Sequence, residues 1–165
     1  MSSDFKNINA ATAFMEQGIL AFASDYNFDF IEKDMALTPR EYQMNALKNF
    51  ISLFETPRES QREYAFNMAT GSGKTNLMAM IISYMKKAGY QRIIFLAHSD
   101  NIINKTRLNV VDSSSGKFLF KNEDFVDEVD NFSSHINGVE IHLTTIQKLH
   151  LAICSGRENS FSIGD

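Results

Sequence analysis

The stretch Met68–Thr75, which reads Met-Ala-Thr-Gly-Ser-Gly-Lys-Thr, constrains this chain more than any other part of it. It follows a short apolar segment, Tyr64–Met68, that predicts a buried strand, and it precedes the helix-length apolar segment Asn76–Met85. A strand, a glycine-rich turn ending in Gly-Lys-Thr and a helix are the three parts of a phosphate-binding loop. The sequence therefore predicts an α/β protein with a nucleotide site.

The residues of this loop have separate expected roles. Gly71 and Gly73 permit positive φ and a close approach of backbone to ligand. Successive backbone N–H groups then converge on an anion at the positive end of the following helix. Lys74, the candidate catalytic residue, is expected to reach the β- and γ-phosphates, and the Thr75 hydroxyl to hold Mg²⁺. The alternative is a glycine-rich turn that carries a surface lysine. The predicted cofactor site comprises Thr70, Gly71, Ser72, Gly73, Lys74 and Thr75.

Composition limits the class of protein. With 165 residues, of which 44% are hydrophobic and 22% charged, the chain is typical of one soluble globular domain. The polar start Met1–Lys6 is no secretory signal, and the apolar run Leu77–Met85 is about half as long as a membrane span. The single cysteine, Cys154, excludes an internal disulfide and a cysteine metal site. We expect a cytoplasmic protein without a membrane partner.

The net charge of −4 argues against a broad basic surface for nucleic acid. It does not exclude a protein that holds phosphates through backbone amides and hydroxyls, because such contacts leave the charge count unchanged.

Two helices are predicted before the loop. Apolar residues at helical spacing from Asn9 to Tyr26 indicate an amphipathic helix, and the segment Asp25–Met35 indicates a short strand or an irregular connection. Thr38 is expected to cap a second helix, with Pro39 at its first position and Glu41 completing a capping box. That helix is expected to end near Thr56–Pro57 and to bury Ala46, Leu47, Phe50, Ile51 and Phe54.

Three elements are predicted after the loop. The apolar run Arg92–Ala97 indicates a parallel strand buried on both faces, and the alternating segment Val139–Thr144 indicates a third core strand. The acidic segment Glu123–Asp130 places Phe125, Val129 and Phe132 on one helical face and predicts a solvated amphipathic helix.

Small polar residues follow both strands. Ligands of open α/β sheets bind beyond the carboxyl ends of the strands, where Ser99, Asn101, Thr144 and Thr145 are expected. The alternative for Ser99, or for Asp100 beside it, is helix capping. Gln43, in the first turn of the helix before the loop, has an amide that can both donate to and accept from an adenine edge. The alternative for Gln43 is an ordinary surface residue.

With these segments in place, the chain resembles the superfamily 2 helicases of the DEAD/DEAH-like group, and within it the motor subunit of type III restriction enzymes. The loop has Met68 where the general pattern has glycine, which the helicase-like motors tolerate. Four segments match in order: Pro39–Gln43, Met68–Thr75, Phe95–Thr106 and Thr144–Gln147.

The resemblance implies a partial RecA-like three-layer sandwich with a mostly parallel sheet, residues 36–165, after an N-terminal helical extension, residues 1–35. It implies ATP and Mg²⁺ as cofactors, with adenine contacted by Arg40 and Gln43. It further implies that Ser99, Asn101, Thr144 and Thr145 contact a nucleic-acid backbone; double-stranded DNA is the expected partner, and the sequence does not distinguish DNA from RNA.

No acidic pair of the Asp-Glu-x-His type follows a strand after Thr75. In the resembled family that pair completes the magnesium site and positions water, and a second RecA-like domain supplies an arginine. We therefore expect the N-terminal part of a longer motor, which binds ATP without hydrolysing it and self-associates through exposed strand edges. The resemblance implies a second RecA-like domain and a modification subunit as partners.

Two other functions remain open. A self-contained nucleotide-binding enzyme, such as a small kinase, needs a second arginine- or aspartate-bearing site for the phosphoacceptor, and none stands out. A non-catalytic interaction module that retains the loop is the other alternative.

Overall fold

The computed structural model describes residues 26–55, 63–132 and 138–154. They form an α/β fold, as predicted, and the predicted helix from Asn9 lies outside the described residues except for Tyr26. No helix within these three ranges is long and apolar enough to cross a membrane. In chain order the elements are α2 (Asp29–Asp34), α3 (Glu41–Glu55), α4 (Lys74–Lys87), β1 (Arg92–Ala97), α5 (Asp100–Val110), β2 (Val126–Glu128), β3 (Val139–Thr145) and α6 (Ile146–Cys154).

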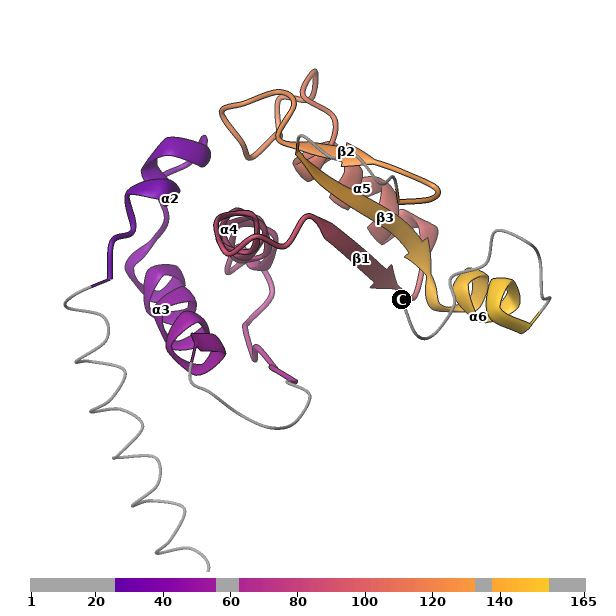
Figure 1. The fold of residues 1–165 in the computed structure, drawn as a ribbon, viewed down its shortest axis with the longest axis horizontal. Coiled ribbons are helices and arrows are strands. Elements are labelled where there is room, and N and C mark those ends of the chain that lie inside the picture. The colour runs from indigo at the N-terminus through magenta and orange to yellow at the C-terminus, as the bar shows by residue number, and fades with distance from the viewer. Residues whose placement is uncertain (1–25, 56–62, 133–137, 155–165) are drawn as a thin grey trace, which may run out of the picture.

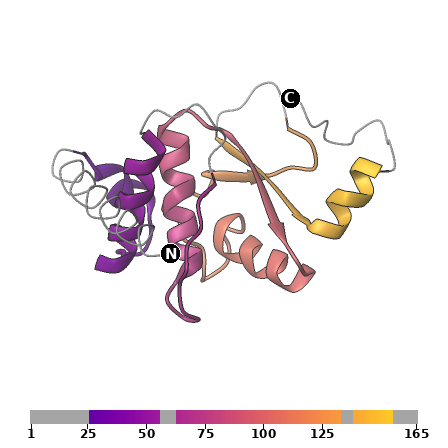
Figure 2. The ribbon, with the colours of Figure 1, turned by 90° about the horizontal axis from the view of Figure 1, so that it is seen from below.

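The three strands form one parallel sheet in the order β1-β3-β2 (Figure 1). Helix α5 connects β1 to the later strands and packs against both β1 and β3. In Figures 1 and 2, α4 lies between the sheet and the α2–α3 pair. This parallel α/β arrangement is a partial RecA-like fold, as the resemblance implied.

Strand β1 has the predicted bounds, but the prediction that both of its faces are buried is wrong. Ile94 is 44% exposed and Leu96 is 45% exposed. The reason is position, because β1 is an edge of the described sheet, whereas β3 lies between two neighbours. Strand β3, predicted as a core strand, is buried along nearly its whole length.

The acidic segment Glu123–Asp130 is not the predicted helix, because it contains β2. Val126 to Glu128 pair in parallel with Val139 to Ile141. Phe125 and Val126 are buried, and the Phe125 ring stacks on Phe120 with centroids 4.3 Å apart. Pairing with β3 and ring stacking are contacts with distant parts of the chain, and they override the helical spacing of three apolar residues.

The segment before α3 contains α2, rather than the predicted strand or irregular connection. Asn27 Oδ1 accepts the Asp29 N–H at 2.7 Å, which stabilises the start of this short helix. Ile31 and Met35 are buried, and the Ser83 hydroxyl of α4 donates to the Asp34 carboxylate at 2.6 Å. Residues 29–35 therefore pack into the same core as α4.

Helix α3 begins at Glu41, so Thr38 is not its cap. The Arg40 carbonyl accepts from the N–H groups of Gln43 and Met44, and the Gln43 Oε1 reaches back to the Arg40 N–H at 3.0 Å. The bond from Gln43 is one half of a capping box, made by Gln43 rather than by the predicted Glu41, and no side chain of Arg40 or Thr38 supplies the other half. The predicted apolar face is confirmed: Leu47, Phe50 and Ile51 are buried, and Ala46 and Phe54 are partly buried against them.

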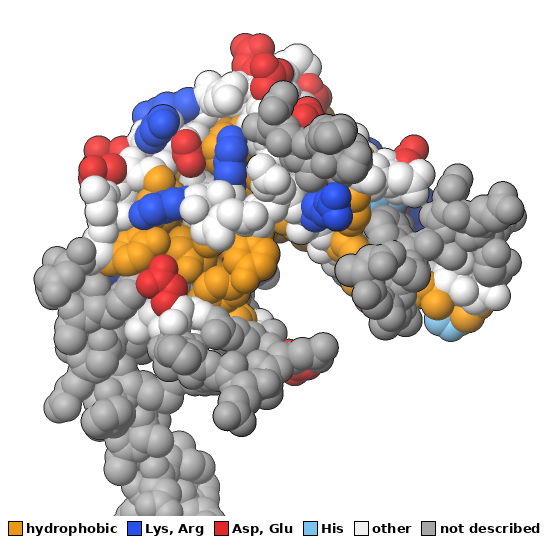
Figure 3. Space-filling model, in the orientation of Figure 1, with side chains coloured by type: hydrophobic (Ala, Val, Ile, Leu, Met, Phe, Trp, Pro, Cys, Tyr) orange, Lys and Arg blue, Asp and Glu red, His pale blue; other side chains and the backbone are white. Residues whose placement is uncertain are grey.

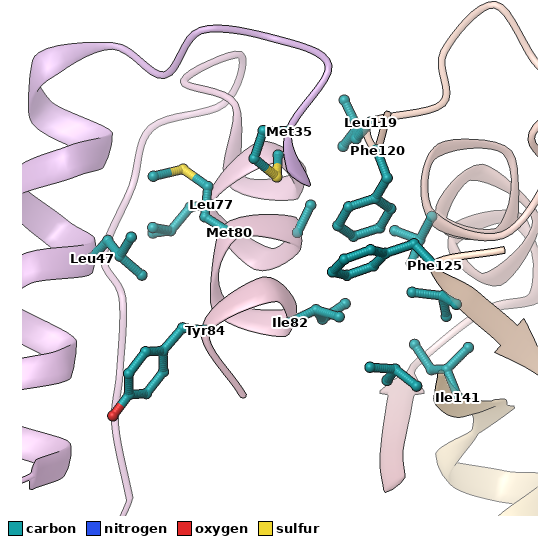
Figure 4. Packing of buried hydrophobic residues seen from close by; sticks show 14 of the residues in the cluster. Met35, Leu47, Leu77, Met80, Ile82, Tyr84, Leu119, Phe120, Phe125 and Ile141 are labelled. Carbon is teal, nitrogen blue, oxygen red and sulfur yellow. The ribbon is translucent and has the colours of Figure 1, made fainter. Parts of the chain in front are cut away.

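The core is built around α4. Figure 4 shows Leu77, Met80, Ile82 and Tyr84 directed from α4 toward α3 on one side and toward the sheet on the other. Tyr84 is 1% exposed, and its hydroxyl donates to Glu55 Oε1 at 3.2 Å. Burial and the neighbouring Glu55 carboxylate raise the pKa of Tyr84. Tyr84 therefore remains a neutral donor in the core.

Lysines border the last turn of α4. Lys86 Nζ lies 3.9 Å from the Phe125 ring centroid, and Lys87 Nζ lies 4.7 Å from that of Phe30 and donates to the Asn27 carbonyl. Figure 3 shows lysine and arginine side chains beside apolar surface on the side of the molecule that it draws. Cations at a helix C-terminus complement its dipole, so these lysines have a structural role.

The segment Tyr64–Met68, predicted as a strand, pairs with no strand among the described residues. Between this segment, α4 and β1 lies an apolar groove of about 560 Å³. Residues of β1 and of Tyr64–Met68 line this groove from either side, and within the described ranges the two segments do not pair. The groove is lined by Phe66, Met68, Lys74, Leu77, Met78, Ile81, Ile82, Met85, Tyr90, Arg92, Ile93, Ile94, Phe95 and Ile141.

Candidate nucleotide-binding site

The glycine turn has the predicted backbone. Gly71 and Gly73 both have φ of +79°, the left-handed region that side chains rarely adopt. The Ser72 N–H and the Ser72 hydroxyl both donate to the Ala69 carbonyl, at 3.3 and 2.7 Å, and close the turn. Helix α4 begins directly afterwards, with Gly73 at its cap position.

The start of α4 suits an anion. No side chain caps it, and its first turn contains no acidic residue. The first N–H groups of a helix have no intrahelical partner, and the helix dipole places partial positive charge at the same end. An anion such as a phosphate group satisfies both the donors and the dipole.

Lys74 lies folded back over the loop. Its Nζ donates to the Met68 carbonyl at 3.2 Å and to the Ala69 carbonyl at 2.9 Å. The side chain is exposed, so the ammonium group can exchange these carbonyls for phosphate oxygens without crossing the core. The geometry permits the predicted role of Lys74.

The donors available for a metal are few. In the part of the chain that the structure describes, no group of three or more His, Cys, Asp or Glu could hold a metal ion. Mg²⁺ bound with a nucleotide takes one or two protein ligands and completes its shell with phosphate and water oxygens. The Thr75 hydroxyl, in the first turn of α4, fits that limited requirement.

Gln43, proposed as an adenine contact, is buried against the loop rather than lying on the surface, and its amide is already engaged. It is 4% exposed, and its Nε2 donates to the carbonyls of Ser72 and Gly73 at 3.1 and 3.2 Å. Its Oε1 accepts from the Arg40 N–H and from Asn76 Nδ2, at 3.0 and 3.1 Å. Contact with an adenine edge requires Gln43 to exchange some of these bonds. Arg40 is exposed beside it.

Two residues at this site were missed by sequence reasoning. The Tyr42 hydroxyl donates to the Ser72 carbonyl at 2.6 Å and accepts from Arg40 Nη1 at 3.2 Å. Asn76 binds Gln43, and its Oδ1 is buried without a hydrogen-bond partner among the described residues. The available signals were the place of Tyr42 next to Gln43 and a polar residue, Asn76, at the head of an apolar helix.

The four residues proposed to contact nucleic acid lie at the end of the sheet where β1 and β3 finish. Thr144 and Thr145 lie opposite Leu96 and Ala97 in the β1–β3 register, and Ser99 and Asn101 follow immediately after β1. Ser99 occupies the cap position of α5 without a side-chain cap bond, and Asn101 is exposed.

The two threonines are less accessible than the residues after β1. Thr144 and Thr145 are buried, and the Thr145 hydroxyl accepts the Lys148 N–H at 3.3 Å. Lys148, not anticipated from the sequence, forms an ion pair with Asp100 at 2.7 Å that joins the starts of α6 and α5. Ser99 and Asn101 are therefore the more available pair.

Comparison with known proteins gives a consistent result. Residues 36–163 match the family model of the type III restriction enzyme, res subunit. The chain is 34% identical over 152 residues to the probable type III restriction-modification enzyme HindVIP Res subunit of Haemophilus influenzae, a match that covers 83% of this chain and 30% of that protein. No solved structure matches the chain.

The two turn glycines provide a matched test of the loop. A Cβ on Gly73 would lie 2.4 Å from Gln43 Nε2, whereas a Cβ on Gly71 meets nothing within 4 Å. Both alanine variants carry the left-handed strain of about 1–2 kcal/mol. We expect Gly73→Ala to lose roughly 1–3 kcal/mol more, because Gln43 must move. Urea unfolding measures both, and equal losses would contradict the packing of Gln43 against the loop.

Proposed function

Because the chain belongs to the type III restriction enzyme res subunit family, we propose that it is the ATP-binding portion of an ATP-dependent DNA helicase or translocase. The observation that carries this proposal is the loop at the start of α4, with two left-handed glycines and uncapped helix N–H groups. The chain spans 30% of the length of the matched Res subunit, so the activity of a whole protein is part of the proposal.

In this proposal each part of the loop makes a different contact with ATP and Mg²⁺. Backbone N–H groups from Thr70 to Thr75 surround the phosphates, and Lys74 contributes the mobile positive charge. Thr75 contributes a hydroxyl to the metal ion. When bound, Mg²⁺ neutralises charge on the β- and γ-phosphates.

Removing the Lys74 ammonium group tests nucleotide binding directly. We expect Lys74→Ala to abolish measurable binding of ATP and ADP, because charge-assisted hydrogen bonds are the strongest contacts to phosphate. Isothermal titration calorimetry on the 165-residue chain measures this. Lys117→Ala is the matched control, because Lys117 is exposed in a loop after α5. Equal ATP affinity in Lys74→Ala and wild type would contradict the proposal.

We propose that Arg40 and Gln43 contact the adenine base. Both lie at the first turn of α3, which contacts the phosphate loop through Gln43. A primary amide offers the donor and acceptor pair that matches the adenine edge. Base contact requires Gln43 to give up part of its present bonding, so ATP binding and the contact between α3 and the loop are coupled.

Base selectivity tests this assignment. We expect Gln43→Ala to erode the preference for ATP over GTP by about 1–3 kcal/mol, the cost of leaving a polar contact unmade. Competition titrations with the two nucleotides give the ratio of affinities. If that ratio is unchanged, Gln43 does not read the base.

We propose DNA as the nucleic-acid partner, since the matched relative is named as a restriction-modification enzyme subunit. Ser99, Asn101, Thr144 and Thr145 would contact the backbone through hydroxyl and amide groups, with Ser99 and Asn101 the more accessible. Such neutral contacts are compatible with a chain of net charge −4. A modification subunit and a second RecA-like domain are further proposed partners.

We propose that residues 36–165 are the first part of the RecA-like domain and residues 1–35 an extension to it. The family match begins at residue 36, which supports this division. The apolar groove beside β1 supports self-association of the isolated chain, because a free strand edge and apolar side chains favour pairing with another chain.

Hydrolysis separates this proposal from its alternatives. We expect the 165-residue chain to bind ATP yet turn it over negligibly, with or without DNA, because its sequence contains no Asp-Glu-x-His motif to position water. Phosphate release and phosphoryl transfer are measured together. Phosphoryl transfer to an acceptor without DNA would favour a small kinase. DNA-stimulated release of phosphate would show that hydrolysis does not need the Asp-Glu-x-His motif. Absence of nucleotide binding would favour an interaction module.

A further inference from the structure

The first turn of α3 binds two consecutive carbonyl groups of the phosphate loop. The Ser72 carbonyl accepts from the Tyr42 hydroxyl at 2.6 Å and from Gln43 Nε2 at 3.1 Å. The Gly73 carbonyl accepts from the same Nε2 at 3.2 Å. These contacts span about thirty positions of sequence, so they are tertiary contacts made for the loop rather than local turn chemistry.

The orientation of a carbonyl fixes the orientation of the next N–H. The described residues contain no cis peptide bond, and in a trans peptide the C=O and N–H point in opposite directions. The Ser72 carbonyl shares a peptide plane with the Gly73 N–H, and the Gly73 carbonyl shares one with the Lys74 N–H. The Gly73 carbonyl also accepts the Leu77 N–H at 3.1 Å, so α4 itself orients that peptide plane. Tyr42 and Gln43 hold the Ser72 carbonyl toward α3, which turns the Gly73 N–H away from α3.

The two side chains are themselves held in place. The Tyr42 hydroxyl has one hydrogen, and since Arg40 Nη1 donates to its oxygen, that hydrogen goes to Ser72. Gln43 is nearly fully buried, and its Oε1 is fixed by the Arg40 N–H and by Asn76 Nδ2. The donors aimed at the loop are thus preorganised before any ligand arrives.

We infer that Tyr42 is a positioning residue for phosphate binding, which with Gln43 holds the Ser72 carbonyl and so orients the Gly73 N–H toward the phosphates. This inference rests on the proposed nucleotide site and deepens it. Tyr42 acts through the loop backbone, so its effect does not depend on the base. That separates it from the adenine contact proposed for Gln43, which acts only on ligands that carry a base.

Inorganic tripolyphosphate, ATP and GTP are the probes that make this distinction. We expect Tyr42→Phe to weaken all three by the same factor, roughly three- to tenfold, the effect of one hydrogen bond. Tyr90→Phe is the matched control, because Tyr90 is another exposed tyrosine and lies beyond the last turn of α4. It should bind all three ligands as wild type does. Calorimetry gives the affinities, and thermal unfolding shows that each variant is folded.

A second variant tests the shared mechanism. Gln43→Met keeps the length of the side chain but removes the amide, so it should also weaken tripolyphosphate binding. Because Tyr42 and Gln43 bind the same Ser72 carbonyl, we expect the double variant to lose less affinity than the two single losses predict together. Independent, fully additive losses would contradict a common action on one peptide.

The outcomes separate the inference from the function on which it rests. If wild type binds none of the three ligands, the proposed nucleotide site is wrong and the inference with it. If wild type binds them and Tyr42→Phe binds tripolyphosphate equally well, Tyr42 does not position the loop. A loss confined to ATP would assign Tyr42 to the base instead and would also overturn the inference.

Discussion

The burial of α4 is the constraint on which the rest of this structure depends. Its middle turns supply Met80, Ile82 and Tyr84 to a core shared by α3, α2 and the sheet. Because packing against several elements fixes the axis of the helix, its first turn is fixed in position and its uncapped N–H groups converge on one point. Core and candidate site are therefore two regions of a single helix.

Local signals in the sequence were sufficient where one segment determines its own structure. The glycines of the loop require positive φ wherever Gly-Ser-Gly precedes a helix, and Arg92–Ala97 is β-branched and apolar enough to form a strand in most contexts. Strand β3 combines alternation with burial in the same way. These elements and the α/β class could be predicted for that reason, whereas the contact of Gln43 with the loop was not predicted.

Contacts between distant segments determined the rest. Segment Glu123–Asp130 has helical spacing, yet Val126 gains more by pairing beside Val139. Tyr64–Met68 has the composition of a strand, but a strand also requires a neighbour to accept its backbone hydrogen bonds. At the site, the place of Tyr42 next to Gln43 did not reveal its partner, because only the fold brings its hydroxyl to a carbonyl thirty residues away. Composition alone does not encode such neighbours.

The folded-back position of Lys74 has a consequence for how tightly any anion is held. Two loop carbonyls already accept hydrogen bonds from the Lys74 ammonium group, so these bonds replace part of its hydration shell. A ligand must therefore bind the ammonium group more strongly than the carbonyls of Met68 and Ala69 do. Monovalent anions offer little improvement, whereas a chain of phosphates offers several oxygens of higher charge density. If the loop binds phosphates as proposed, the carbonyls of Met68 and Ala69 compete with the ligand for Lys74 and favour polyphosphates over monovalent anions.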